Sequence, residues 1–273
     1  MRFAAAVLAA GVVYGQTFDA VSVKPAAGGR FVTSGGPGSR EPGRVRFAGA
    51  TLQYLLETAY DLQAFQIAGP GWLDTERFDV DAVLSPDATK EQFRAMLQNL
   101  LMARFQMKTH RESREMPGYA LVALRNGARL QAAEDLGPED PAEGAPRLEL
   151  GKDGFFVPPR RPGVFLQLIG AAGARESFRQ STMRELADSL QRQLLRPVAD
   201  ATGLTGKYDF TLTFATEGLF MGRGRIPVGP GGGENLPDVF NALRSQLGLR
   251  LEQRKGAVET LVIEHVEKRP TEN

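Results

Sequence analysis

The residues of this chain that could carry chemistry are few and widely spaced. His110 and His265 are the only histidines among 273 residues, and cysteine is absent. A zinc site needs three or four nitrogen, sulfur or oxygen ligands, and metallopeptidase helices place two histidines four residues apart around a glutamate. Neither pattern occurs here. We therefore expect no metal site and no bound cofactor, and we interpret both histidines as exposed strand residues beside acidic neighbours.

Acidic residues in two strand-like segments are the next candidates. Asp79, Asp81 and Asp209 alternate with apolar residues, and paired carboxylates serve in acid–base catalysis. We interpret them instead as solvated or hydrogen-bonded strand residues. A Ser-His-Asp triad is defined by geometry, but no Gly-x-Ser-x-Gly motif raises that expectation. The sequence therefore names no catalytic residue, and an enzyme is the less favoured class.

Three residues are candidates for binding a partner. Trp72, the one tryptophan, follows Gly-Pro-Gly at residues 69–71. It is either a core anchor or an exposed contact of the type enriched in interface hot spots. Arg223 and Arg225 alternate with glycines in the Gly/Pro-rich residues 218–233, which lack the Gly-Lys-Ser/Thr ending of a phosphate loop. This segment is predicted to be a loop.

The elements that must position these residues occur twice in the same order. Residues 51–60 have the apolar spacing of a helix, residues 77–82 alternate as a strand, and a Thr-x-x-Gln capping box at Thr89 opens a second helix. The same order follows from Thr182. The step is 131 residues from Thr51 to Thr182. We predict a duplicated unit; the alternative is that any two α+β segments look alike at this level of detail.

The predicted fold class is α+β, with two repeated βαββαββ-like units that each contain antiparallel hairpins. The hairpins are expected between residues 105–109 and 119–123, and between residues 249–251 and 258–266 with a turn at Lys255-Gly256. The predicted organisation is a signal peptide at 1–15, a first repeat at 16–125, a long Gly/Pro-rich connection at 126–174 and a second repeat at 175–273.

The first residues are typical of an export signal. Arg2 precedes an uncharged apolar run at residues 3–13, and small or modest side chains follow up to Gly15. A run of this length is roughly half of the ~20 residues that span a bilayer as a helix. The alternative is a buried N-terminal helix or strand. We expect cleavage near Gly15 and a periplasmic or secreted protein of the bacterial envelope, without a transmembrane segment in the mature chain.

The balance of charged residues argues against one class of partner, nucleic acids. The chain has 33 Lys and Arg against 32 Asp and Glu. Because nucleic-acid binding proteins carry a basic excess that neutralises phosphates, we expect no nucleic-acid partner. The expected partner is an envelope protein, a peptide or a glycan.

Several motifs, taken in order, resemble one known family. They include Phe18-Asp19 with Val23-Lys24-Pro25, Thr51-Leu52, Trp72-Leu73-Asp74 with Arg77-Phe78-Asp79, Arg104-Phe105, His110-Arg111-Glu112, Thr202-Gly203-Leu204, Tyr208-Asp209-Phe210 and Leu247-Gly248-Leu249. The mature chain thereby resembles the soil-associated family of exported bacterial proteins, catalogued as a domain of unknown function. The resemblance implies export and no established activity. Some relatives carry a similar domain after a membrane-embedded metallopeptidase, a region that this chain lacks.

Each half is also similar, by its pattern of elements, to the short N-terminal module of secretins and TonB-dependent receptors, which binds other envelope proteins. The leading hypothesis is therefore a non-enzymatic envelope module that binds a partner through strand edges and insertions. The alternatives are an exported hydrolase with a site between the two repeats and an extracytoplasmic sensor domain.

Overall fold

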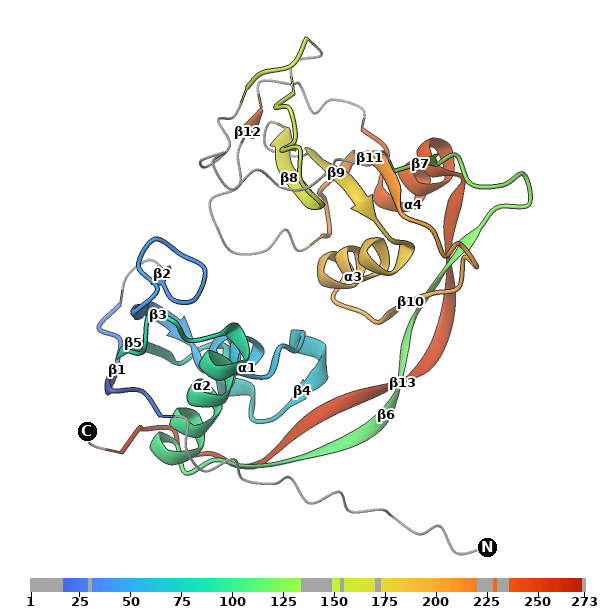
Figure 1. Ribbon diagram of the computed structural model, residues 1–273. Helices are drawn as coiled ribbons and strands as arrows, with labels where there is room; N and C mark the ends of the chain where they lie inside the picture. Colours follow the sequence, from blue (N-terminus) through green and yellow to red (C-terminus); the bar gives the residue numbers. More distant parts are fainter. Residues whose placement is uncertain are drawn as a thin grey trace, which may run out of the picture. The chain divides into compact units, whose positions relative to one another are not determined.

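The computed structural model describes residues 17–28, 31–133, 149–152, 155–169, 173–219, 228–229 and 236–271. Helices and sheets occur together along the chain, which confirms the predicted α+β class. The chain divides into two compact units. Unit 1 consists of residues 1–113 and 259–273, and unit 2 of residues 114–258. Each unit is described below by itself (Figure 1).

Unit 1 is a four-stranded sheet packed against two helices. Its elements are β1 (Ala20–Pro25), β2 (Val32–Gly35), β3 (Arg44–Thr51), α1 (Leu52–Tyr60), the 3-10 turn η1 (Ala64–Gln66), β4 (Ile67–Ala68), the 3-10 turn η2 (Gly71–Asp74), β5 (Arg77–Val83) and α2 (Lys90–Arg104). The strand order is β1-β5-β3-β2, and all three pairings are antiparallel. The apolar stripes of both helices and the inner face of the sheet form one core, which includes Phe47, Leu56, Phe78, Leu97 and Phe105.

The helix starts of unit 1 follow from local side-chain bonds. The Thr51 side chain accepts a hydrogen bond from the Tyr54 backbone N–H at 3.2 Å, which satisfies one of the unpaired donors of a first helical turn. At α2 the capping box is complete, because Gln92 N–H bonds to Thr89 Oγ1 and Thr89 N–H bonds to Gln92 Oε1. The predicted helix near Thr51 and the predicted capping box at Thr89 are confirmed.

Unit 2 is also a sheet packed against helices. Its elements are β7 (Gln131–Ala132), β8 (Gly163–Ile169), β9 (Gly173–Ser181), α3 (Met183–Leu194), β10 (Val198–Asp200), β11 (Tyr208–Ala215), β12 (Val228–Gly229), α4 (Val239–Ala242) and the π-helical segment η3 (Leu243–Leu247). The strand order is β12-β8-β9-β11-β7. The strands β7 and β8 lie within residues 126–174, the stretch predicted to be a connection.

The two units have corresponding strand orders. In each unit the strand that leads into the first helix, β3 or β9, pairs antiparallel with the next strand of the same sheet, β5 or β11. On the other side it pairs with the preceding strand, β2 or β8. Thr182 caps α3 with the same box, closed by Glu185, that Thr89 forms at α2. The duplication itself stays a prediction, tested by superposing the units in an experimental structure.

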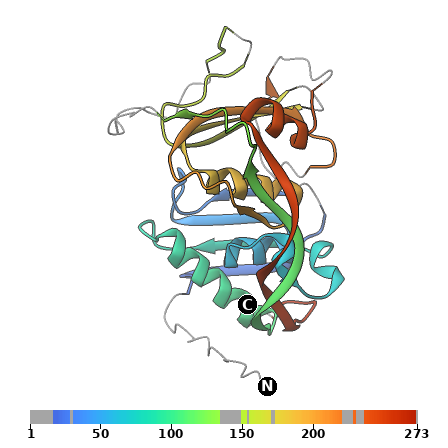
Figure 2. The same cartoon turned by 90° about the vertical axis from the view of Figure 1, so that its right-hand side faces the viewer.

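Two long strands replace the predicted hairpins. Strand β6 runs from Lys108 to Ala123 and β13 from Leu249 to His265, and each is continuous. They are neighbours in a second sheet of order β10-β6-β13-β4, and Figures 1 and 2 both show them side by side in green and red. The unit boundaries fall inside β6 and β13, so residues 259–273 belong to unit 1.

The predicted hairpins at residues 105–123 and 249–266 are therefore wrong, for an identifiable reason. A tight two-residue turn needs a residue with positive φ, and neither Lys255 nor Gly256 has one. Gly118, within β6, instead allows the Pro197 backbone to pack closely against the strand. A Cβ at Gly118 would lie 2.4 Å from the Pro197 carbonyl oxygen, and the Tyr119 N–H donates to that same oxygen at 2.8 Å.

Some predictions fall outside the described residues. The signal peptide at 1–15 and the arginines Arg223 and Arg225 are among them. Within the described part of the chain, no helix is both long enough and apolar enough to cross a bilayer.

Candidate functional site

The edge strand β2 of unit 1 has a pocket on each face. The pocket on the helix side, called the inner pocket, has a volume of about 300 Å³, and the pocket on the opposite side, called the outer pocket, about 250 Å³. The strand residues that line the inner pocket are Thr33, Gly35, Val45 and Phe47. The outer pocket is lined by the residues between them: Ser34, Arg44 and Arg46, together with Glu41. This alternation follows from the two-residue period of a strand, which puts the pockets on opposite faces of the β2–β3 pair.

The backbone of β2 presents hydrogen-bonding groups to the sheet edge. In the antiparallel β2–β3 register, Gly35 pairs with Val45 and Thr33 with Phe47. The Gly36 N–H bonds to the Arg44 carbonyl at 2.8 Å, so the hydrogen-bonded positions of β2 are the even-numbered ones. Because these positions alternate along a strand, the N–H and C=O groups of Thr33 and Gly35 point away from β3. Among the described residues, β2 is the last strand of its sheet on this side.

The opposite edge of the same sheet is formed by β1, which ends in a proline. Ala26 N–H bonds to the Arg77 carbonyl at 2.9 Å, which makes Lys24 a position bonded to β5 and Pro25 an outward-facing one in the observed register. Proline has no backbone N–H, and it blunts a strand edge against further pairing. Both edges carry outward backbone groups, at Thr33 and Gly35 on β2 and at Val21 and Val23 on β1, but the β1 edge ends in Pro25, which has no N–H.

The end of β2 is shaped by two glycines with positive φ. Gly35 has φ +75° and Gly36 has φ +89°, a region that only glycine adopts without strain. A Cβ at Gly35 would lie 1.9 Å from the Arg44 carbonyl oxygen, whereas one at Gly36 would meet the Val45 side chain at 3.6 Å. Position 35 therefore requires glycine, because the Arg44 carbonyl lies too close for a side chain. This turn begins the connection from β2 to β3, and Gly35, Gly36 and Pro37 line the inner pocket.

Aromatic rings form the wall of the inner pocket. Tyr54 on α1 packs edge-on against Phe47 on β3, with ring centroids 6.2 Å apart, and against Phe31, just before β2, at 4.7 Å. Phe93 on α2 completes this wall and packs against Phe18 at 6.1 Å. Such edge-to-face pairs are favourable beyond the area that they bury. The wall suits an apolar side chain.

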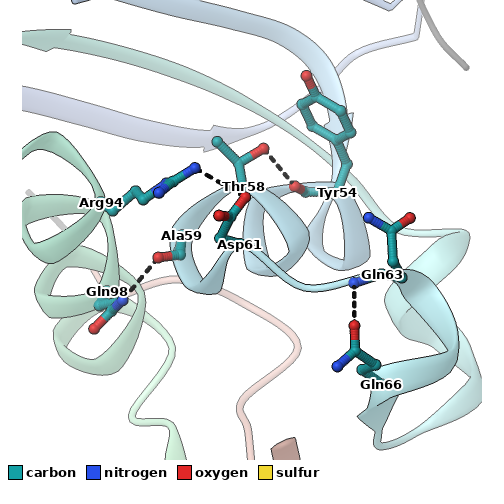
Figure 3. Close-up of polar contacts among 8 residues, drawn as sticks. All are labelled: Tyr54, Thr58, Ala59, Asp61, Gln63, Gln66, Arg94 and Gln98. Carbon is teal, nitrogen blue, oxygen red and sulfur yellow. Dashed lines mark hydrogen bonds and ion pairs between the residues drawn. The ribbon is translucent and has the colours of Figure 1, made fainter. Parts of the chain in front are cut away.

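Polar bonds hold the two helices that flank the inner pocket. Asp61 ends α1 in the left-handed conformation, with φ +53°. Figure 3 shows the Arg94 side chain extending from α2 to Asp61, where the two form an ion pair at 2.8 Å. One turn later, Gln98 donates to the Ala59 carbonyl at 2.7 Å. These bonds fix the spacing of α1 and α2, and Lys90 adds an exposed cation at the start of α2.

The outer pocket is polar. Arg44 donates two hydrogen bonds to Asp81 on β5, from Nε to Oδ1 at 2.8 Å and from Nη2 to Oδ2 at 2.6 Å. The Arg44 bond, and secondarily the charges of Arg44 and Arg46, lower the pKa of the Asp81 carboxyl. Arg46 lies directly opposite Asp81 in the β3–β5 register and opposite Ser34 in the β2–β3 register. Because Ser34 is short, the Arg46 guanidinium has room toward the sheet edge.

Asp79 and Asp209 take the same structural role in the two units. Strands β3 and β9 each contain a bulge, where Gly49 and Gln180 have positive φ. The Gly49 N–H donates to Asp79 Oδ1 at 2.7 Å, and the Gln180 N–H donates to Asp209 Oδ1 at 2.7 Å. These carboxylates are hydrogen-bonded strand residues, as the sequence predicts. They satisfy the backbone donor that each bulge leaves unpaired.

The histidines lie on exposed parts of unit 1. His110 Nδ1 contacts Glu264 Oε1 at 2.7 Å, and His265 Nε2 contacts Glu267 Oε1 at 3.1 Å. Each imidazole is about half exposed. Among the described residues, no group of three or more potential ligands could hold a metal ion. Trp72 sits in η2, half-buried against the core of unit 1, which matches the core-anchor interpretation more closely than the exposed one.

A buried acid in unit 2 has no counterpart in the sequence interpretation. Glu176 on β9 is 2% exposed. Its Oε1 accepts hydrogen bonds from Ser189 Oγ at 2.9 Å and from Gln193 Nε2 at 2.7 Å, both on α3. Burial raises the pKa of the Glu176 carboxyl, and the two hydrogen bonds oppose that effect. The sequence signal that could have revealed this buried acid is a glutamate inside an alternating stretch, followed by a Ser and a Gln four residues apart on a helix.

Comparison with known proteins gives one match. A family model described as a protein of unknown function matches residues 53–266. No curated protein and no solved structure matches the chain. The family match confirms the resemblance to a catalogued domain of unknown function. The soil-associated character of the family and the similarity to the secretin and TonB module stay predictions.

Proposed function

The chain belongs to the family of proteins of unknown function DUF3738, and we propose that it is a binding module that accepts an extended segment of another polypeptide as an added strand beside β2. The observation that carries this proposal is the outermost position of β2 between two pockets. Strand addition supplies affinity through backbone hydrogen bonds and specificity through pockets for alternate side chains. The outward groups of Thr33 and Gly35 would provide the first of these.

The two pockets define the chemistry of the added segment. Residues of an added strand point alternately to the two faces of a sheet. One set would enter the aromatic inner pocket, beside Phe47 and Tyr54, and the other would face Ser34 and Arg46 across the outer pocket. The segment is therefore an amphipathic strand, with apolar side chains toward α1 and polar, hydrogen-bonding side chains toward the outer face.

We also propose that the protein acts outside the cytoplasm. The support is the basic and apolar pattern of residues 2–15, which is typical of a cleaved signal peptide. Mass spectrometry of protein recovered from a bacterial envelope fraction tests this point. A mature N-terminus near residue 16 is expected, and an N-terminus at Met1 in the cytosol would contradict it.

Two substitutions at one position test strand addition. Thr33→Pro removes the outward N–H, whereas Thr33→Val keeps that donor and the side-chain shape. Peptides would be selected on the mature protein from a random displayed library, and their Kd measured by fluorescence polarisation. Because a backbone hydrogen bond contributes about 1 kcal/mol and a proline ring also obstructs pairing, Thr33→Pro should weaken binding about tenfold. Thr33→Val should bind within about twofold of the parent.

The selected sequences are a second readout of the same experiment. They should alternate apolar and polar residues, since the two pockets differ in chemistry. Failure to select any peptide, or equal Kd values for Thr33→Pro and the parent protein, would overturn the proposal. Thermal unfolding of both variants confirms that the proline has not unfolded unit 1.

A further inference from the structure

Unit 2 contains a pocket of its own, on the sheet face that points away from α3. Its volume is about 380 Å³, inside the range of roughly 300–1,000 Å³ found for small-molecule sites. Ser177 on β9 and Thr211 on β11 are register partners and form part of its floor. Ser177 precedes the bulge of β9 at the position where Arg46 precedes the bulge of β3. The corresponding register partners in unit 1 are therefore Arg46 and Asp81. The shorter side chains in unit 2 leave room on this face that long charged residues take up in unit 1.

The first cation of this pocket, Arg129, is held in place by two bonds to η3. Its backbone N–H donates to the Leu247 carbonyl at 2.8 Å, and its Nη1 donates to the Ser245 carbonyl at 2.9 Å. A guanidinium has five N–H donors in a planar fork. One of them is used for Ser245, so the anchored group retains donors for a ligand at the pocket wall.

The second cation, Arg179, comes from β9. Its Nη1 forms an ion pair with Asp209 Oδ2 at 3.7 Å, longer than an ordinary hydrogen bond. The other oxygen of Asp209 accepts the Gln180 N–H at the bulge, and the Asp209 side chain is only 12% exposed. The lining of the pocket thus includes two guanidiniums and one carboxylate, which leaves one positive charge in excess. This balance favours an anionic ligand.

The remaining surface of the pocket is polar. Ser177 and Thr211 offer hydroxyls. The neighbouring residues Phe178 and Phe210 project to the other face of the sheet, because side chains alternate along a strand, and their rings stack there in the core of unit 2 with centroids 4.5 Å apart. A ligand with both a carboxylate and hydroxyl groups matches this surface better than an apolar one does.

We propose that the unit 2 pocket binds a small hydroxylated carboxylate of the sugar-acid class. The carboxylate would bridge the guanidiniums of Arg129 and Arg179, since planar forks bind carboxylates with two parallel hydrogen bonds. The hydroxyl groups would bond to Ser177 and Thr211. This site is distinct from the β2 edge and does not depend on strand addition there.

The test uses D-glucuronate as the probe and D-glucose as its neutral counterpart. Both would be titrated into the isotopically labelled mature protein and followed by NMR. Glucuronate should shift the resonances of residues around Arg179 and Thr211 in a saturable way, and glucose should bind at least about tenfold more weakly, because hydrogen bonds to charged groups are the stronger ones.

Matched substitutions locate the site. Arg179→Gln should raise the Kd for glucuronate about tenfold or more, whereas Arg184→Gln, an exposed change on α3 outside the pocket, should leave it unchanged. Arg129→Gln should also weaken binding. If that variant unfolds for want of its Ser245 bond, Arg179→Gln still decides the question. The proposal is overturned if glucuronate does not saturate the wild-type protein, if glucose binds equally well, or if Arg179→Gln binds like the parent.

Discussion

Replacing Asp79 by alanine tests how the sheet of unit 1 is held together at its bulge. The Asp79 carboxylate accepts the Gly49 N–H at 2.7 Å in a part-buried setting. A hydrogen bond to a charged group contributes about 1.5–3 kcal/mol, and a buried donor left unpaired costs about 1–3 kcal/mol. We therefore expect Asp79→Ala to lower the free energy of unfolding by about 2–3 kcal/mol. Asp79→Asn keeps an acceptor and should lose about half as much.

The matched control is Asp81→Ala, two residues along the same strand. Asp81 pairs with Arg44 on the solvent-exposed face, and exposed ion pairs contribute about 0–1 kcal/mol. Urea unfolding followed by circular dichroism, with linear extrapolation, measures all three variants. The bulge explanation fails if Asp79→Ala stays within about 0.5 kcal/mol of the parent or if Asp81→Ala costs as much as Asp79→Ala.

Three further substitutions probe other parts of the fold. The folded state binds the Glu176 proton more tightly than the unfolded chain does, so the free energy of unfolding should fall as pH rises from the ordinary carboxyl range through the raised pKa. Glu176→Gln should flatten this part of the pH profile in urea unfolding, and an unchanged profile would contradict burial of the acid. Gly35→Ala, whose Cβ would lie 1.9 Å from a carbonyl oxygen, should cost more than the roughly 1–2 kcal/mol of a left-handed residue, and more than Gly36→Ala in the same unfolding assay; equal losses would argue against the close approach. Leu195→Gly, at φ +50° after α3, should raise the thermal midpoint by relieving about 1 kcal/mol of strain, and a lowered midpoint would show that the Leu195 side chain contributes more than its backbone costs.

Local elements were predictable because their signals are local. The apolar spacing and the cap at Thr51, the box at Thr89 and the alternation of residues 77–82 correspond to α1, α2 and β5. Gly248 ends η3 in the left-handed conformation, as expected for a helix C-terminus. Each of these depends on side chains within a few residues of one another, so the sequence alone contains the information.

Pairing between distant strands was not predictable in the same way. The alternation in residues 108–123 and 249–265 indicates strands but names no partner, and a hairpin is the simplest partner for a strand. Lys255-Gly256 was predicted to be a turn, although it lies inside the continuous strand β13. The pockets at the β2 edge depend on which strand is outermost, and Glu176 becomes notable only when α3 places Ser189 and Gln193 over it.

Strand addition beside β2 is tested by amide hydrogen exchange at Thr33 and Gly35 while a selected peptide is titrated into the mature protein. Outward N–H groups exchange readily, and strand addition would bond them to the peptide backbone. We expect strong new protection at both amides, with Val21 and Val23 on the opposite edge unchanged. Peptide binding that leaves Thr33 and Gly35 unprotected would contradict it.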